Sequence, residues 1–284
     1  MNIKKIAVLG SGTMGSGIAQ VAAQSGYEVL LIDVDQKFID RALAGISKGF
    51  QKAVDKGKMT AEDKEQVFGR IKGSISYEDC KDVDLVIEAI LENMDLKKQV
   101  YKQLDEKCPD HAILASNTSS LSITEMAAAT KRSDKVVGMH FFNPAQVMKL
   151  VEVIPGLDTS EETIAAITEV AKKMNKVPVN AKESPGFIVN RILVPMINEA
   201  VIALGEGIGT IEEIDTAMKL GAGMPMGPLA LADMVGIDIV LAVAEVFYKE
   251  FADSKYRPAL LLKQMVRAGH LGVKTGRGFY SYQK

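Results

Sequence analysis

The fold is decided by residues 3–35, which read IKKIAVLGSGTMGSGIAQVAAQSGYEVLLIDVD. Ile3–Leu9 is a short apolar run that closes on a glycine, a pattern typical of a strand buried on both faces. Thr13–Gly26 has the apolar spacing of a helix, and Tyr27–Ile32 is a second short apolar run. A strand, a helix and a strand in this order predict a βαβ unit, the building block of a parallel sheet.

Three glycines in the first turn of this unit form the pattern GxGxxG, which is typical of dinucleotide binding. Gly10 permits the tight turn, Gly12 lets the backbone approach a pyrophosphate, and Gly15 lets the helix pack close to the strand. The helix that begins here directs free N–H groups and its positive dipole end toward the phosphates. The cofactor-binding candidates of this turn are Gly10, Gly12, Thr13, Met14 and Gly15.

Asp33 ends the second strand, 23 residues after Gly10, and completes the pattern. Its carboxylate is expected to accept hydrogen bonds from the adenosine ribose and to repel a 2′-phosphate. No arginine follows it directly, so we expect NAD rather than NADP as the cofactor. The alternative, a glycine turn followed by an acidic helix cap, is disfavoured because strand, glycines, helix and acid all agree in spacing.

Further short apolar runs recur along the first two thirds of the chain and alternate with helical stretches. They lie at residues 85–87, 112–115, 136–139, 150–154 and 177–179. This alternation predicts an α/β fold, with a doubly wound, mainly parallel sheet of the Rossmann type covered by helices on both faces.

The pattern changes near Glu183–Gly186, and helical patterns dominate after it. They lie at residues 189–204, 211–220, 229–251 and 259–268. We therefore expect an NAD-binding Rossmann-type domain over residues 1–183 and an all-α domain over residues 184–284. The second domain has more apolar helix faces than a domain of about 100 residues usually buries alone, so we expect it to form a homodimer or a higher homo-oligomer.

The composition excludes several classes of protein. A net charge of −2 over 284 residues gives no basic excess for binding nucleic acid. The most apolar stretch, residues 228–247, is interrupted by three acidic residues and is expected to be buried rather than to span a membrane. Cys80 and Cys108 form no CxxC pair or His/Cys cluster, so we expect no metal site. Free thiols and the lack of an apolar leader favour a cytoplasmic location.

His140 follows the apolar run 136–139 and leads into Phe141–Pro144. Ligands of open α/β sheets bind beyond the carboxyl ends of the strands, and an imidazole is suited to taking a proton from an alcohol near neutral pH. The alternative is a structural histidine, hydrogen-bonded in the core or at the strand end. Position alone does not decide between the catalytic and the structural role. The other histidines, His111 and His270, lie in polar and glycine-rich surroundings.

Three further polar features accompany His140. Glu152 sits inside the apolar run 150–154, where a carboxylate needs a partner; a histidine would serve, although an exposed edge-strand position remains an alternative. Residues 116–120 are small and polar and follow the run 112–115, either as hydrogen-bond donors or as a helix cap. Asn190 lies in an apolar stretch. Its amide is either functional and reaches back to the cleft, or forms structural hydrogen bonds.

Several segments together resemble the L-3-hydroxyacyl-CoA dehydrogenase family, and within it the bacterial type that acts on 3-hydroxybutyryl-CoA. They are residues 10–15, ASNTSS at 115–120, MHFFNP at 139–144, SPGFIVNR at 184–191 and KTGRGFY at 274–280. The segments occur in order along nearly the whole chain. The resemblance implies reversible hydride transfer between NAD(H) and C3 of a short acyl-CoA, from acetoacetyl-CoA to (S)-3-hydroxybutyryl-CoA, in butyrate or butanol fermentation.

The resemblance also implies roles for individual residues. His140 is the general acid and base, with Glu152 as its orienting partner, and Ser119 and Asn190 hydrogen-bond the substrate oxygen. The positions that match cofactor contacts are Glu92, Lys97, Asn117 and Asn143.

A lysine cluster offers candidates for binding the phosphates of CoA. Lys52 and Lys56 are four residues apart, which puts them on one helix face, and Lys58 follows. A solvated charged face is the alternative for each lysine.

Three rival functions stay open from sequence alone. One is an NAD-dependent sugar-acid dehydrogenase of the L-gulonate type, which has no use for a CoA-binding lysine cluster. Another is a non-catalytic NAD-binding structural or sensor protein. The third is a free-standing relative of a fused fatty-acid oxidation module.

Overall fold

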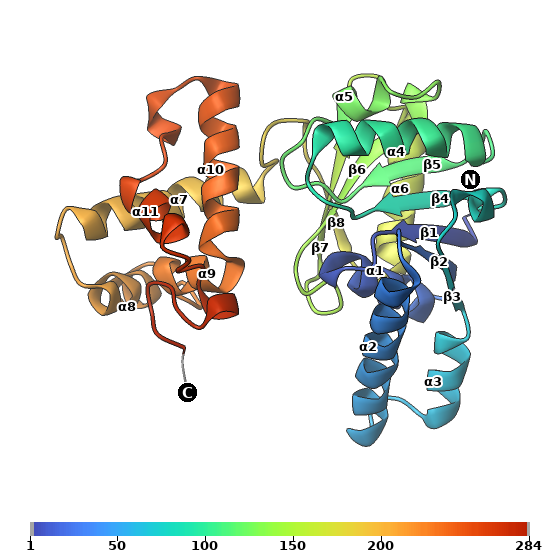
Figure 1. The fold of residues 1–284 in the computed structure, drawn as a ribbon, viewed down its shortest axis with the longest axis horizontal. Helices are drawn as coiled ribbons and strands as arrows, with labels where there is room; N and C mark the ends of the chain where they lie inside the picture. The colour runs from blue at the N-terminus through green and yellow to red at the C-terminus, as the bar shows by residue number, and fades with distance from the viewer. Residues whose placement is uncertain (1–2, 283–284) are drawn as a thin grey trace. The chain divides into compact units, whose positions relative to one another are not determined.

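The computed structural model describes residues 3–282. The chain divides into two compact units, Met1–Glu183 and Ser184–Lys284, each of which is described by itself (Figure 1). No helix within residues 3–282 is long and apolar enough to cross a membrane.

The first unit is built on one eight-stranded sheet with the order β3-β2-β1-β4-β5-β6-β7-β8. The strands are β1 (Lys5–Leu9), β2 (Glu28–Ile32), β3 (Ile71–Ser74), β4 (Leu85–Glu88), β5 (Ile113–Ser116), β6 (Val136–Phe141), β7 (Leu150–Pro155) and β8 (Val177–Asn180). All neighbours run parallel except β6 and β7, which are antiparallel. The prediction of a mainly parallel, Rossmann-type sheet is confirmed.

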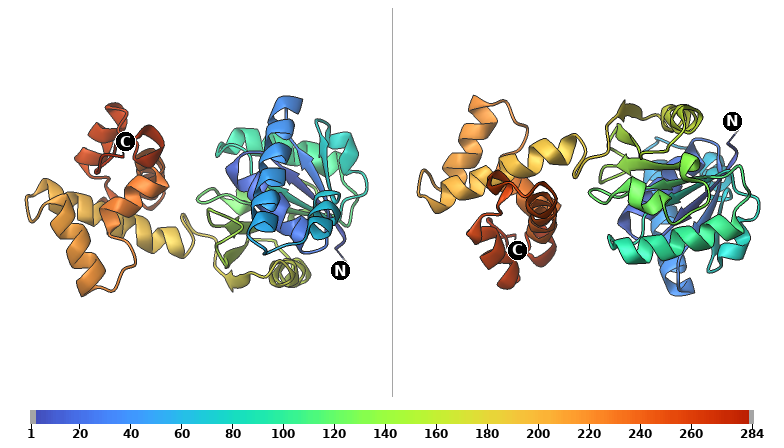
Figure 2. Two further views of the ribbon diagram at one scale, coloured as in Figure 1. Left: turned by 90° about the horizontal axis from the view of Figure 1, so that it is seen from below. Right: turned by 90° about the horizontal axis from the view of Figure 1, so that it is seen from above.

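Helices cover both faces of this sheet. They are α1 (Thr13–Gln24), α2 (Gln36–Asp55), α3 (Ala61–Phe68), α4 (Met94–Lys107), α5 (Ile123–Ala127) and α6 (Glu161–Lys173). Figure 2 shows α4 and α6 on opposite sides of the sheet. Apolar side chains of α1, α2 and α6 pack with those of the strands in one core. Burial of these apolar faces holds the helices against the sheet.

Two features of the sheet differ from the sequence prediction. The strand β3, with the sequence IKGS, was not predicted, because it is short and has no apolar run; its pairing with β2 at the sheet edge makes it a strand. The strand β6 extends to Phe141, so His140 lies inside the strand rather than directly after it.

The second unit is helical in the described residues, as predicted. It contains α7 (Val189–Gly205), α8 (Ile211–Gly221), α9 (Pro228–Val235), α10 (Ile237–Phe251) and α11 (Leu260–Arg267) around a separate apolar core. The prediction of one helix over 229–251 is wrong. Gly236 separates α9 from α10 with φ of 105°, a backbone conformation that glycine adopts readily and other residues rarely.

Candidate active site

The glycine turn between β1 and α1 has the conformation that its sequence requires. Gly10 has φ of 89°, and a Cβ on Gly15 would lie 1.7 Å from the Gly10 carbonyl oxygen, so neither position tolerates a side chain. A Cβ on Gly12 would meet nothing within 4 Å. The backbone conformation therefore requires glycine at positions 10 and 15. Gly12 is not required by the fold, but it leaves open space in front of the helix N-terminus.

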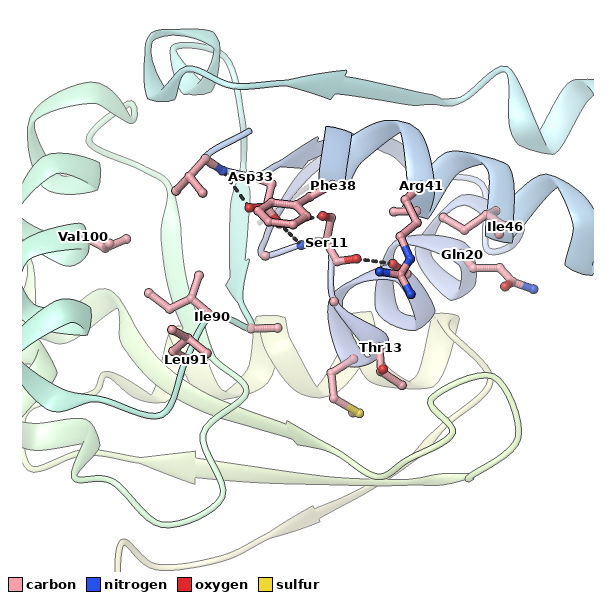
Figure 3. A pocket seen from close by; sticks show the side chains of 18 of the residues that line it. Ser11, Thr13, Gln20, Asp33, Phe38, Arg41, Ile46, Ile90, Leu91 and Val100 are labelled. Carbon is pink, nitrogen blue, oxygen red and sulfur yellow. Dashed lines mark hydrogen bonds between the residues drawn. The ribbon is translucent and has the colours of Figure 1, made fainter. Parts of the chain in front are cut away.

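A pocket of about 940 Å³ lies over this turn (Figure 3). Of the predicted cofactor residues, it is lined by Gly10, Gly12, Thr13, Met14 and Asp33. Gly15 does not line it. A turn of glycines, a helix N-terminus and a carboxylate in one pocket fit a dinucleotide, with N–H groups for its pyrophosphate and an acceptor for its ribose.

Asp33 is held in place by the turn that it faces. Its Oδ2 accepts hydrogen bonds from the backbone N–H and from the hydroxyl of Ser11, at 2.7 and 2.5 Å. These bonds fix the carboxylate at the carboxyl end of β2, where the sequence argument expected it.

Several residues that line the pocket were not predicted. They include Gln20, Phe38, Arg41, Tyr77 and Gln146. Phe38 and Arg41 lie on α2, and Figure 3 shows both labelled side chains on the same wall as Asp33. No arginine directly follows Asp33 in the sequence, but α2 brings a more distant one, Arg41, to the pocket. A helical projection of residues 36–46 would have found it.

His140 and Glu152 face each other across the two antiparallel strands. They are register partners on β6 and β7, and His140 Nδ1 lies 2.8 Å from Glu152 Oε2. Both are buried, with exposed fractions of 4 % and 0 %. The alternative of an exposed edge-strand glutamate is wrong, because β7 lies between β6 and β8.

The second ring nitrogen of His140 faces Ser119, whose hydroxyl oxygen lies 3.1 Å from Nε2. A carboxylate on Nδ1 favours the tautomer that carries its proton there, so Nε2 is the nitrogen that can exchange a proton with a ligand. The contacts join a hydroxyl, an imidazole and a carboxylate in one chain, which suits proton transfer to or from an oxygen.

The small polar segment 116–120 joins β5 to the next helix. The Asn117 side-chain oxygen accepts from the Phe141 N–H at 2.8 Å, so it ties β5 to β6. The helix cap that the sequence offered as an alternative falls on Ser122, which accepts from Glu125 N–H at the start of α5. Ser119 is thus left to face His140.

Glu92 and Lys97 lie beside this segment. Lys97 Nζ contacts Glu88 Oε1 at 2.6 Å and Glu92 Oε2 at 3.2 Å. The Lys97 side chain is only 1 % exposed, whereas that of Glu92 is 40 % exposed. Glu88 was missed in the sequence because it reads as the end of an apolar strand; an acidic residue there was the available signal.

The remaining predicted residues lie elsewhere on the two units. Asn143 is exposed in the segment between β6 and β7, directly before Pro144. Lys52 and Lys56 are exposed at the end of α2, where Lys56 caps the helix through its N–H. Asn190 is half-buried on α7 of the second unit.

Comparison with known proteins identifies both units. Residues 5–184 match the sequence model of the 3-hydroxyacyl-CoA dehydrogenase NAD-binding domain, and residues 186–282 match the C-terminal domain of the same family. The chain belongs to the 3-hydroxyacyl-CoA dehydrogenase family. The predictions of this family, of NAD as cofactor and of an oxidoreductase are confirmed.

Individual members of this family are similar over their full length. The chain is 56 % identical to 3-hydroxybutyryl-CoA dehydrogenase of Clostridioides difficile, over 99 % of this chain and 100 % of the relative. It is 42 % identical to the human mitochondrial hydroxyacyl-coenzyme A dehydrogenase, over 99 % and 92 %. The crystal structure of (S)-3-hydroxybutyryl-CoA dehydrogenase from Ralstonia eutropha superposes with a TM-score of 0.96, at 53 % identity and full coverage of both chains.

Proposed function

We propose that this chain interconverts acetoacetyl-CoA and (S)-3-hydroxybutyryl-CoA with NAD(H). The observation that carries the proposal is the buried His140–Glu152 pair with Ser119 on the second ring nitrogen of His140, on the same sheet as the dinucleotide turn. The names of the relatives in Clostridioides difficile and Ralstonia eutropha support the four-carbon substrate.

His140 is the acid and base of the proposed reaction. In the direction of reduction, its Nε2 donates a proton to the C3 oxygen of the substrate, and Glu152 stabilises the imidazolium from which the proton leaves. Ser119, and Asn190 of the second unit, donate hydrogen bonds to the same oxygen as negative charge develops on it. NAD, when bound, supplies the hydride chemistry at C3.

Other residues bind the two large ligands in this proposal. Glu92, Lys97, Asn117 and Asn143 contact the cofactor, together with the glycine turn. Lys52 and Lys56 bind phosphates of CoA, supported by two exposed ammonium groups one turn apart at the end of α2. Residues 1–183 carry the NAD site, and residues 184–284 contribute to the substrate site.

We also propose a homo-oligomer formed through the second unit. Large apolar side chains are exposed there, among them Ile192 at 67 %, Leu220 at 83 % and Leu260 at 66 %. Surfaces of this kind mark interaction sites when they are contiguous. A cytoplasmic location is supported by two free, buried thiols, Cys80 and Cys108, and we place the reaction in butyrate or butanol fermentation.

A substrate panel tests the proposal. NADH oxidation is followed with acetoacetyl-CoA and with longer 3-oxoacyl-CoA thioesters. In the reverse direction, NADH formation is followed with NAD and a free sugar acid such as L-gulonate. We expect the highest kcat/KM with the four-carbon thioester. Turnover of the sugar acid alone would assign the chain to the sugar-acid type. Tight NADH binding without any turnover would make it a non-catalytic NAD-binding protein.

The choice between NADH and NADPH tests the role of Asp33. We expect Asp33→Ala to lower kcat/KM for NADH by about 10- to 100-fold, the value of a charged hydrogen bond to the ribose, and to raise the NADPH/NADH ratio of kcat/KM. Arg41 would then face the 2′-phosphate without a competing carboxylate. Asp35→Ala is the matched control, because Asp35 caps α2, pairs with Lys37 and does not line the pocket. An unchanged ratio in Asp33→Ala would remove Asp33 from cofactor selection.

A further inference from the structure

Glu88 is a fully buried carboxylate for which the reaction above has no use. It ends β4, has an exposed fraction of 0 %, and sits opposite Ser116 of β5 in the sheet register. Its Oε1 accepts from the Ile90 N–H at 2.8 Å and from Lys97 Nζ at 2.6 Å, while its Oε2 accepts from the Ser116 hydroxyl at 2.8 Å. Every one of these contacts lies within the first unit.

Two routes of hydrogen bonds lead from Glu88 to the segment that carries Ser119. One route is ionic: Lys97 bridges Glu88 to Glu92, and Glu92 Oε1 accepts from the Ser119 N–H at 2.9 Å. Ser119 then contacts His140 through its hydroxyl, and His140 contacts Glu152.

The second route is neutral and runs through the segment itself. The Ser116 hydroxyl donates to Glu88 and accepts from the Thr118 N–H at 3.2 Å. The Thr118 hydroxyl donates to Glu92, which closes the ring. In addition, the Glu88 carbonyl oxygen accepts from the Asn117 N–H at 2.7 Å. Glu88 therefore holds the start of this segment directly, at Ser116 and Asn117, and reaches Ser119 through Lys97 and Glu92.

Such a buried charge is not explained by stability alone. Breaking a buried ion pair is costly, but a pair replaced by apolar residues of the same volume is often neutral or stabilising. The neighbouring Tyr101 stays neutral, because burial, followed by the charge of Glu88, raises the pKa of its hydroxyl well above the ordinary value. Lys97 supplies the positive charge that faces both Glu88 and Glu92.

We propose that Glu88 and Lys97 form a positioning pair that holds Ser119 against His140. The pair does not touch the reacting atoms. It fixes the orientation of Glu92 and of the 116–119 segment, so that the Ser119 hydroxyl lies within hydrogen-bond distance of His140 Nε2. The ammonium of Lys97 contacts both carboxylates and holds them together. The proposal rests on the role proposed for His140.

The test compares Glu88→Gln, Lys97→Met and the double variant Glu88→Gln/Lys97→Met. We expect each to lower kcat by about tenfold or more, because small displacements of a positioned group cost one to two orders of magnitude, while KM for acetoacetyl-CoA changes less than about twofold.

The double variant removes both charges and keeps the net charge of the cluster, and we expect its kcat to stay low with little change in KM for acetoacetyl-CoA. It also serves if a single variant fails to fold, because it leaves fewer unpaired charges buried.

Asp105→Asn is the matched control, because Asp105 lies near the other end of α4. It pairs with Arg132 at 2.8 Å, and the two side chains are 7 % and 8 % exposed. We expect it to lower Tm and leave kcat and KM unchanged. The proposal is overturned if Glu88→Gln and Lys97→Met behave like Asp105→Asn, with lower Tm but wild-type kcat. If His140→Ala is itself fully active, the proposed function of His140 fails instead, so the two failures are distinguishable.

Discussion

Replacing His140 with alanine is expected to lower kcat for acetoacetyl-CoA reduction by about 10³- to 10⁴-fold, the range that general acid–base catalysis supplies. The variant loses both the proton donor and the partner of Glu152, with which His140 Nδ1 makes a 2.8 Å contact. NADH affinity is expected to stay within about twofold, because His140 does not line the pocket over the glycine turn. Stopped-flow NADH oxidation gives kcat, and fluorescence titration gives the NADH Kd.

His111→Ala is the matched control for this prediction. His111 also contacts a carboxylate, Asp84 at 3.1 Å, but its side chain is 55 % exposed and lies before β5 rather than at its carboxyl end. We expect wild-type kcat from it. A His140→Ala enzyme that retains more than about a tenth of wild-type kcat would remove His140 from the acid–base role.

Alanine at Gly12 and at Gly15, two positions of the same turn, is expected to have different effects on NADH binding and on Tm. We expect Gly12→Ala to keep the Tm of the ligand-free protein while weakening NADH binding by about 100-fold or more, since its Cβ meets no protein atom within 4 Å but enters the space in front of the helix N-terminus. Gly15→Ala is expected to lower Tm instead, because its Cβ would lie 1.7 Å from the Gly10 carbonyl oxygen and the turn must move. Thermal unfolding and NADH titration measure both quantities on each variant.

Gly49→Ala controls for the added methyl group. Gly49 lies on α2, where the nearest atom to a Cβ is Gln20 Oε1 at 3.8 Å, and alanine favours a helix by up to about 1 kcal/mol. We expect unchanged NADH binding and a slightly higher Tm. If Gly12→Ala and Gly15→Ala lose Tm equally, the turn has no ligand-specific position, and the distinction drawn above is wrong.

The dinucleotide unit could be predicted from sequence because its signals are local. Each strand is a short apolar run, each glycine has one steric reason, and Asp33 follows at a fixed spacing. The strand β3 has no such signal, since its partner β2 rather than its own sequence makes it a strand. Gly236 was passed over because one glycine in an apolar helical pattern is compatible with a continuous helix; only its φ of 105° shows the break.

The residues of the candidate site also include some that the sequence predicted and some that it missed. His140 and Glu152 could be proposed as a pair because each stood out as a polar residue in an apolar strand, and the antiparallel register of β6 and β7 supplied the contact. Arg41 and Glu88 were missed, although a helical projection of α2 and an acidic residue at the end of an apolar strand were available signals; their contacts depend on where α2 and α4 are placed against the sheet. Sequence periodicity does not give that placement.

The proposed reaction is tested most directly by identifying the product of a single reaction. The protein is mixed with NADH and acetoacetyl-CoA, NADH absorbance is followed to completion, and the thioester formed is resolved by chiral chromatography. We expect one NADH oxidised for each (S)-3-hydroxybutyryl-CoA formed. Absence of NADH oxidation with acetoacetyl-CoA, in a protein that is folded and binds NADH, would contradict it.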